Sequence, residues 1–185
     1  LIKGSGGSAY VDFTDQSTAV RVESIIEASI IIHNFEYFTY GFRFETTNRW
    51  IMETLFLGPK NYQLKYLYYI KLLENSWFNE NTFFKINNGG GTSESTTFFL
   101  DCSSGLEANG NHFIQPSITG NTGFDLNDTQ EFKVYDLRQE AYRTNLKAKN
   151  STNIYITNNF PYNSPKLVYD ISYDSNFRSR YLEPH

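Results

Sequence analysis

The chain has 185 residues, a net charge of −4, one cysteine and two tryptophans. This length corresponds to about one domain, and the single cysteine, Cys102, excludes an internal disulfide and a cysteine-based metal cage. The acidic balance argues against a nucleic-acid partner. No apolar run reaches the roughly 18 residues of a membrane-spanning helix, so we expect no membrane insertion.

The first half of the chain is predicted to form β-strands. Residues 1–8, rich in Gly and Ser, are interpreted as a flexible lead or an added tag, and residues 9–185 as a single domain. Residues 35–45 alternate apolar and polar side chains, which is typical of a strand with one buried face. Residues 48–57 fit a strand or a short capped helix. Residues 62–73 form the longest strand-like run, and aromatic content of 17 % supports the β interpretation.

The second half of the chain supplies a predicted hairpin and a predicted helix. Residues 82–86 and 96–102 are expected to pair across a glycine-rich turn. Residues 136–149 are expected to form a helix, with Asp136 as the N-cap, Gln139 in the reciprocal capping position and apolar residues at three-to-four spacing. The predicted fold is therefore β-rich α+β, with an antiparallel sheet packed on, or clasping, that one helix. The pattern shows no internal repeat.

A search for catalytic motifs leads to no enzyme class. The chain has no Gly-x-Ser-x-Gly motif, and its histidines are His33, His112 and His185. A hydrolase that uses His33 or His112 stays open as an alternative, and it requires a cleft with a nucleophile and a carboxylate. We expect no catalytic residue, no metal site and no cofactor.

Two loops carry the residue types that recognise carbohydrate, namely a flat aromatic ring beside planar amides and a charge. In residues 75–81 we expect Trp77 to be the platform and Asn75, Asn79 and Asn81 the amide partners. The pair Arg49–Trp50 is a further candidate. The alternative is that each tryptophan anchors its loop to the core.

The composition and the C-terminal segment Asn176-Phe177-Arg178-Ser179-Arg180-Tyr181 resemble the head domain of a group B rotavirus spike protein. Arg178 and Arg180 lie where the trypsin-sensitive edge of such a head would be. The resemblance implies a β-sheet gripping a helix, binding of host glycans of the N-acetyllactosamine type, and a place on the virion surface as part of the outer-capsid spike.

The sequence therefore predicts a non-enzymatic, lectin-like attachment domain whose partners are host glycans and the rest of the spike. Two alternatives remain open. One is a bacterial or phage carbohydrate-binding module. The other is a structural coat or assembly domain without a ligand, which predicts a large apolar interface instead of an exposed aromatic groove.

Overall fold

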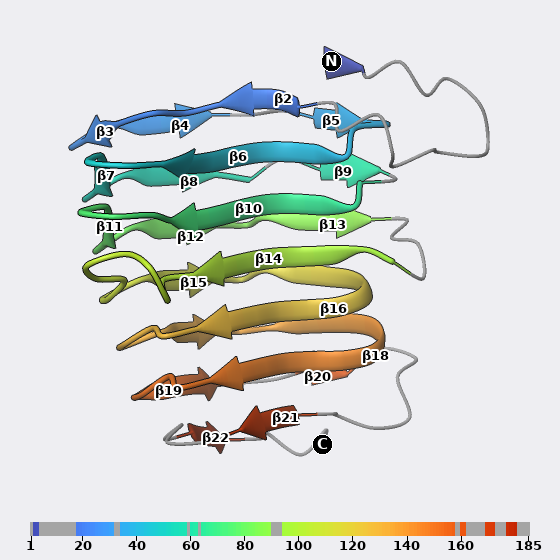
Figure 1. The fold of residues 1–185 in the computed structure, drawn as a ribbon. Coiled ribbons are helices and arrows are strands. Elements are labelled where there is room, and N and C mark those ends of the chain that lie inside the picture. The colour runs from blue at the N-terminus through green and yellow to red at the C-terminus, as the bar shows by residue number, and fades with distance from the viewer. Residues whose placement is uncertain are drawn as a thin grey trace.

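The structure is a computed structural model that describes residues 2–3, 18–31, 34–58, 60–62, 64–89, 94–157, 160–161, 169–172 and 177–180. Throughout these residues the chain forms strands and turns, with no helix. The strands wind into successive coils that stack from the N-terminal to the C-terminal end, and all paired strands run parallel (Figure 1). The described part is thus a parallel β-solenoid.

The solenoid has a front sheet of long strands, seen nearest the viewer in Figure 1. Within the described residues, seven strands contribute to this sheet. Two of them are long strands that bend around a corner, so only their C-terminal parts belong to it. In stacking order the seven strands are β2 (Thr18–Arg21), β6 (Tyr40–Thr46), β10 (Tyr66–Leu72), β14 (Thr96–Asp101), β16 (Ser117–Asn127), β18 (Arg138–Lys149) and β21 (Tyr169–Ser172).

Three further sheets complete the coils. The back sheet contains β4 (Ser29–Ile31), β8 (Leu55–Leu57), β12 (Thr82–Phe84), β15 (His112–Ile114), β17 (Lys133–Tyr135), β19 (Ile154–Thr157) and β22 (Phe177–Arg180). The side sheet contains β1 (Ile2–Lys3), β5 (Asn34–Glu36), β9 (Lys60–Tyr62), β13 (Asn87–Gly89), the first parts of β16 and β18, and β20 (Phe160–Pro161). A short sheet between front and back contains β3 (Ile25–Ile26), β7 (Trp50–Met52) and β11 (Trp77–Asn79).

The core is a set of ladders in which equivalent positions of successive coils stack. Phe83 lies between Phe56 and Phe113, with ring centroids 4.6 and 4.4 Å apart and ring planes within 5°. All three are buried. Stacked rings of this kind add about 0.5–1.5 kcal/mol per pair beyond the burial of their area. The front sheet contributes a second buried ladder of Phe42, Tyr68, Phe98, Phe124 and Leu146.

The corners are made by residues in the left-handed backbone region. Between the short sheet and the back sheet, Glu27, Glu53 and Glu80 have φ of 50°, 49° and 57°. Gly110 takes the same corner in the next coil with φ 61°. A residue other than glycine pays roughly 1 kcal/mol for this conformation, so the closed coil must supply the compensating hydrogen bonds. Glu53 N, for example, donates to Asn79 O of the next coil at 3.1 Å.

The predicted antiparallel sheet packed on a helix is wrong. Residues 136–149, the expected helix, form a corner followed by strand β18. Asp136 is not an N-cap but a corner residue with φ 54°. The three-to-four spacing was a coincidence of a strand in which Leu146 and Ala148 are buried while Lys147 and Lys149 face outward. The β-sheet gripping a helix that the spike-head resemblance implied is likewise not observed.

The predicted hairpin and the absence of repeats are also wrong. β12 pairs with β8 and β15, and β14 pairs with β10 and β16, each in parallel. The Asn-Asn-Gly segment that was interpreted as a turn is strand β13. The structure does repeat, since Leu55, Thr82 and His112 are register partners in successive coils. Of the predicted lead, Ile2–Lys3 forms β1, which pairs with β5, and the rest lies outside the described residues.

Candidate functional site

The short sheet presents both tryptophans of the chain side by side. Trp50 of β7 and Trp77 of β11 are register partners in neighbouring coils. Their side chains are 39 % and 37 % exposed, their ring centroids lie 6.4 Å apart and their planes are inclined by 40°. Large aromatic rings are seldom this exposed without a reason, so the pair marks a candidate site.

Polar groups adjoin the tryptophan pair at the turns that enter the two strands. Asn75 Nδ2 donates to Asn48 Oδ1 at 2.9 Å, which uses one end of each amide. Asn48 and Asn75 both have left-handed backbone conformations, with φ of 56° and 55°. The Arg49 guanidinium is exposed and donates to Asn48 O at 3.1 Å. We call Asn48, Arg49, Trp50, Asn75 and Trp77 the tryptophan corner.

Asn79 and Asn81, both predicted to bind glycan, lie elsewhere. Asn79 is 6 % exposed, and its amide donates to Glu107 Oε2 at 3.1 Å and accepts from Asn109 N at 3.0 Å. Asn81 is fully buried inside the solenoid. The structure therefore brings Arg49, Trp50, Asn75 and Trp77 together at the surface and places the other two amides in structural roles.

Asn81 belongs to an internal amide ladder that links three coils. Its Oδ1 accepts from Thr54 N at 3.1 Å, and its Nδ2 donates to Ile51 O at 3.2 Å and to Asn111 Oδ1 at 3.0 Å. Asn111 in turn donates to Phe78 O at 2.8 Å. Each side chain satisfies backbone groups that the corner would otherwise leave unpaired, which explains why polar amides lie inside an aromatic core.

The front sheet carries a second candidate surface built from two columns of outward side chains. In register, the first column is Arg43, Tyr69, Phe99, Asp125 and Lys147. The second is Glu45, Lys71, Asp101, Asn127 and Lys149. Because neighbouring strands are about 4.8 Å apart, each column is a row of closely spaced side chains along the solenoid axis.

The N-terminal part of this surface is aromatic. Tyr40 stacks on Tyr66 with centroids 5.5 Å apart, and Tyr69 stacks on Phe99 at 4.9 Å with planes 9° apart. The Arg43 guanidinium lies 4.7 Å from the Tyr40 ring centroid, in the geometry of a cation–π contact. We call Tyr40, Tyr66, Tyr69 and Phe99 the aromatic strip.

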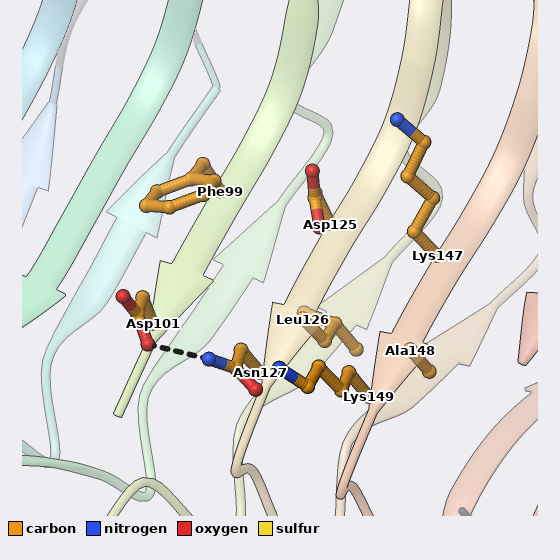
Figure 2. Close-up of a pocket in the computed structure, with 8 residues that line it drawn as sticks. All are labelled: Phe99, Asp101, Asp125, Leu126, Asn127, Lys147, Ala148 and Lys149. Carbon is orange, nitrogen blue, oxygen red and sulfur yellow. Dashed lines mark hydrogen bonds between the residues drawn. The ribbon is translucent and has the colours of Figure 1, made fainter. Parts of the chain in front are cut away.

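Beyond Phe99 the surface is hollowed. A depression of about 300 Å³ is lined by the side chains of Phe99, Asp101, Asp125, Asn127, Lys147 and Lys149, with the buried residues Leu126 and Ala148 beneath (Figure 2). Asn127 Nδ2 donates to Asp101 Oδ1 at 2.9 Å, the dashed line in Figure 2. We call this depression the front hollow.

Asp101 and Tyr69 are among the front-sheet residues with shifted pKa values. Burial by itself would raise the pKa of Asp101, but hydrogen bonds from the hydroxyl and backbone N–H of Ser103 and from Asn127, with the nearby Lys71, hold it below its usual value. Asp101 is therefore ionised at neutral pH. Burial, followed by the charge of Glu45, raises the pKa of Tyr69 to about 12.

A second depression lies on the back sheet beside His112. It has a volume of about 510 Å³ and is lined by Glu80, Asn109, Gly110, His112, Gln130, Glu131, Lys133 and Asn153. This lining contains no hydroxyl or thiol nucleophile, as the hydrolase alternative would require. Burial and Lys133 lower the pKa of His112. The other histidine of that alternative, His33, lies outside the described residues.

The structure also places the cysteine and the two arginines of the predicted cleavage edge, and it bears on metal sites and membrane-spanning helices. The side chain of Cys102 is buried and only 6 % exposed. Arg178 and Arg180, the predicted cleavage edge, lie in β22, which pairs with β19. Within the described ranges, the His, Cys, Asp and Glu side chains form no group of three or more suited to a metal ion. In the same part of the chain, no helix has the length and hydrophobicity for crossing a membrane.

Comparison with known proteins gives no further assignment. No protein-family model matches the chain, and no curated protein or solved structure is significantly similar to it.

Sequence reasoning missed the front surface entirely. Its residues come from three strands, with Tyr69 in β10, Phe99 and Asp101 in β14 and Asp125 in β16, and Lys147 was assigned to a helix. The available signal was the alternation within each strand, for example Phe98 and Leu100 buried against Phe99 and Asp101 facing outward. Without the parallel register, nothing in the sequence indicates that these outward positions stack.

Proposed function

We propose that the protein is a non-enzymatic carbohydrate-binding domain and that the tryptophan corner contacts the sugar. The observation that carries the proposal is the exposed pair of indole rings in neighbouring coils, 6.4 Å apart and beside surface amides. The apolar face of a sugar ring packs on such rings, and amides and a guanidinium supply both donors and acceptors for its hydroxyls.

The assembly-domain alternative is less well supported at this surface. An interface between protein chains also favours Trp and Arg, but its centre is apolar and its charged groups lie at the rim. Here the exposed amides of Asn48 and Asn75, each two residues before one of the tryptophans, bond to each other in the turns that enter the two strands. A rigid backbone of stacked strands also holds both indoles at fixed positions, which reduces the entropy lost on binding a small ligand.

The setting of this function is part of the proposal. The resemblance to group B rotavirus spike heads supports a virion-surface domain that binds host glycans of the N-acetyllactosamine type, with the rest of the spike as its second partner. On a particle that displays many copies, weak binding at each site is sufficient, because multivalency multiplies it. A bacterial or phage carbohydrate-binding module would use the same surface.

The tryptophan corner has its own spectroscopic reporter, because Trp50 and Trp77 are the only tryptophans of the chain. We would screen the multivalently displayed domain on a glycan array and titrate the monomeric domain with each hit while recording tryptophan fluorescence. Binding should change the emission of the wild type. Trp77→Ala and Trp50→Ala should each weaken binding by about tenfold or more, the usual cost of truncating a central aromatic contact.

Ile31→Ala is the matched control, because Ile31 is 63 % exposed but lies in β4 of the back sheet. It should bind as the wild type does. Binding that persists in both tryptophan variants would remove the tryptophan corner from the proposal. An array without binding, together with concentration-dependent self-association that the tryptophan variants abolish, would favour the assembly domain.

A further inference from the structure

We propose that the front sheet carries a second, separate site, which binds a neutral oligosaccharide chain laid along the solenoid axis over the aromatic strip and the front hollow. It goes beyond the tryptophan corner, because it uses other strands, other side chains and a ligand of several sugar units. Neither site needs the other in order to bind.

The aromatic strip and the front hollow form one continuous surface. Phe99 belongs to both, since it stacks on Tyr69 on one side and lines the hollow on the other. Strand register then places Asp125 and Lys147 in line with Phe99 in the next two coils. From β6 to β18 this surface crosses five strands, and the four spacings between them, at about 4.8 Å each, give a length of about 20 Å. That length suits a chain of sugars rather than a single ring.

The charges of the front hollow indicate a neutral ligand. Asp101 and Asp125 carry two formal negative charges, and Lys147 and Lys149 carry two positive charges. The hollow therefore has no net formal charge that would select an anion or a cation. It does offer strong acceptors on one side and strong donors on the other, and the hydroxyl groups of a sugar satisfy both, because each hydroxyl donates and accepts.

The walls of the hollow supply the apolar and rigid parts of such a site. The half-buried Phe99 ring, supported from one side by Tyr69 at 4.9 Å, offers a flat apolar border for the C–H face of a sugar. Asp101 is held by Asn127 Nδ2 at 2.9 Å and by the Ser103 backbone N–H at 3.0 Å. Because these side chains stand on paired strands, their positions are fixed before a ligand arrives.

The test is calorimetric titration with soluble hexasaccharides of β-1,4-glucose, α-1,4-glucose, β-1,3-glucose, β-1,4-mannose and β-1,4-N-acetylglucosamine, with the disaccharide of each, and with oligogalacturonate as the anionic comparison. At least one neutral hexasaccharide should bind, about tenfold or more tighter than its disaccharide. Phe99→Ala and Asp125→Asn should each weaken that binding by about tenfold. The affinity should change less than twofold between low and high salt, because no charge on the ligand is screened.

Two variants separate this site from the tryptophan corner. The double variant Trp50→Ala/Trp77→Ala should keep the affinity for the hexasaccharide within about twofold. Tyr155→Ala, which removes an outward ring from β19 of the back sheet, is the matched control for Phe99→Ala and should also bind normally. Circular dichroism confirms that each variant is folded.

Three results would overturn the proposal. They are no binding of any neutral hexasaccharide, wild-type binding by Phe99→Ala and Asp125→Asn, and salt-sensitive binding of oligogalacturonate alone. Loss of hexasaccharide binding only in the double tryptophan variant would assign the chain-binding site to the tryptophan corner and would refute the second site while supporting the first.

Discussion

Replacing Asn81 by alanine distinguishes the role in glycan binding that the sequence predicts from the role in stability that the structure indicates. If Asn81 contacted a glycan at the surface of a loop, its replacement would weaken glycan binding and leave the stability of the fold nearly unchanged. In the structure it is fully buried, and its amide joins three coils through Thr54 N, Ile51 O and Asn111 Oδ1. The structure therefore predicts that Asn81→Ala is a stability variant.

The expected loss of stability follows from the hydrogen bonds that the substitution removes. Three buried hydrogen bonds of 3.0–3.2 Å disappear, each with a net contribution of about 1 kcal/mol. The Thr54 N–H also loses this partner inside the solenoid, which adds about 1–2 kcal/mol for an unsatisfied buried donor. The free energy of unfolding should fall by about 3–5 kcal/mol. At about 2–4 °C per kcal/mol for a domain of this size, Tm should fall by about 6–20 °C.

The assay is urea unfolding followed by circular dichroism, with glycan binding measured on the folded variant. Asn75→Gly is the control, because it removes an exposed amide that bonds Asn48 at the surface and glycine adopts the φ of 55° freely. Its free energy of unfolding should differ from that of the wild type by no more than about 0.5 kcal/mol. A change below about 1 kcal/mol in Asn81→Ala, or a specific loss of binding without loss of stability, would refute the internal ladder.

Asn81→Asp tests the direction of the bonds. The aspartate keeps an acceptor for Thr54 N but cannot donate to Ile51 O while ionised. Burial should raise its pKa in the folded state above the unfolded value of about 3.9. The variant should then be most stable below that pH and lose stability as pH rises through the folded pKa. Equal stability at pH 4 and pH 7 would contradict this.

Three further predictions concern the core and two titrating groups. Phe83→Ala removes the central ring of the Phe56–Phe83–Phe113 stack and should cost about 3–5 kcal/mol in urea unfolding; a loss under 1 kcal/mol would contradict the stack. Burial, with nearby carboxylates, raises the pKa of the Cys102 thiol to about 12, so iodoacetamide at pH 8 should label it only after unfolding, and rapid labelling of the native protein would place it at the surface. The pKa of Tyr69, raised to about 12, exceeds the unfolded value near 10, so the free energy of unfolding should fall between those pH values, and Tyr69→Phe should reduce that fall in pH-dependent urea unfolding.

Much of the β-structure could be predicted from local pattern, because alternation depends only on which side chains face the core. The strands predicted over 35–45 and 62–73 largely coincide with β6 and β10, although the first residues of each prediction belong to β5 and β9 of the side sheet. Phe42 and Phe44 share the buried face, as the alternation indicates. Of the candidate site, Asn75 with Trp77 and Arg49 with Trp50 were predicted as two separate candidates, and the structure brings them to one surface. These four residues could be predicted from the sequence because Trp, Arg and Asn are residue types that recognise carbohydrate.

The parallel stacking could not be predicted from local pattern, because the partner of each strand lies a whole coil away. Residues 82–84 and 96–101 are close in sequence and resemble a hairpin, yet each pairs with strands of the preceding and following coils. The helix prediction failed for a related reason. Residues 138–149 pair with β16, and the register shifts between Gly120 and Thr122 of that strand. The partner again lies a coil away, and the three-to-four spacing of apolar residues, which is a coincidence, was the only local signal.

Unequal coil lengths explain why the repeat escaped detection and why the surface columns are diverse. Tyr66, Thr96, Thr122 and Thr144 are register partners, although 30, 26 and 22 residues separate them in turn. Corners and loops absorb these differences, so the strands stay aligned while no fixed period remains in the sequence.

Inside the solenoid, the alignment forces similar side chains to stack, as in Phe56, Phe83 and Phe113. Outside, nothing imposes similarity, so a column can change from aromatic rings to carboxylates and ammonium groups within a few strands. A surface of this kind can match the apolar face and the hydroxyls of a sugar chain at successive positions, which is the property on which the proposed front site depends.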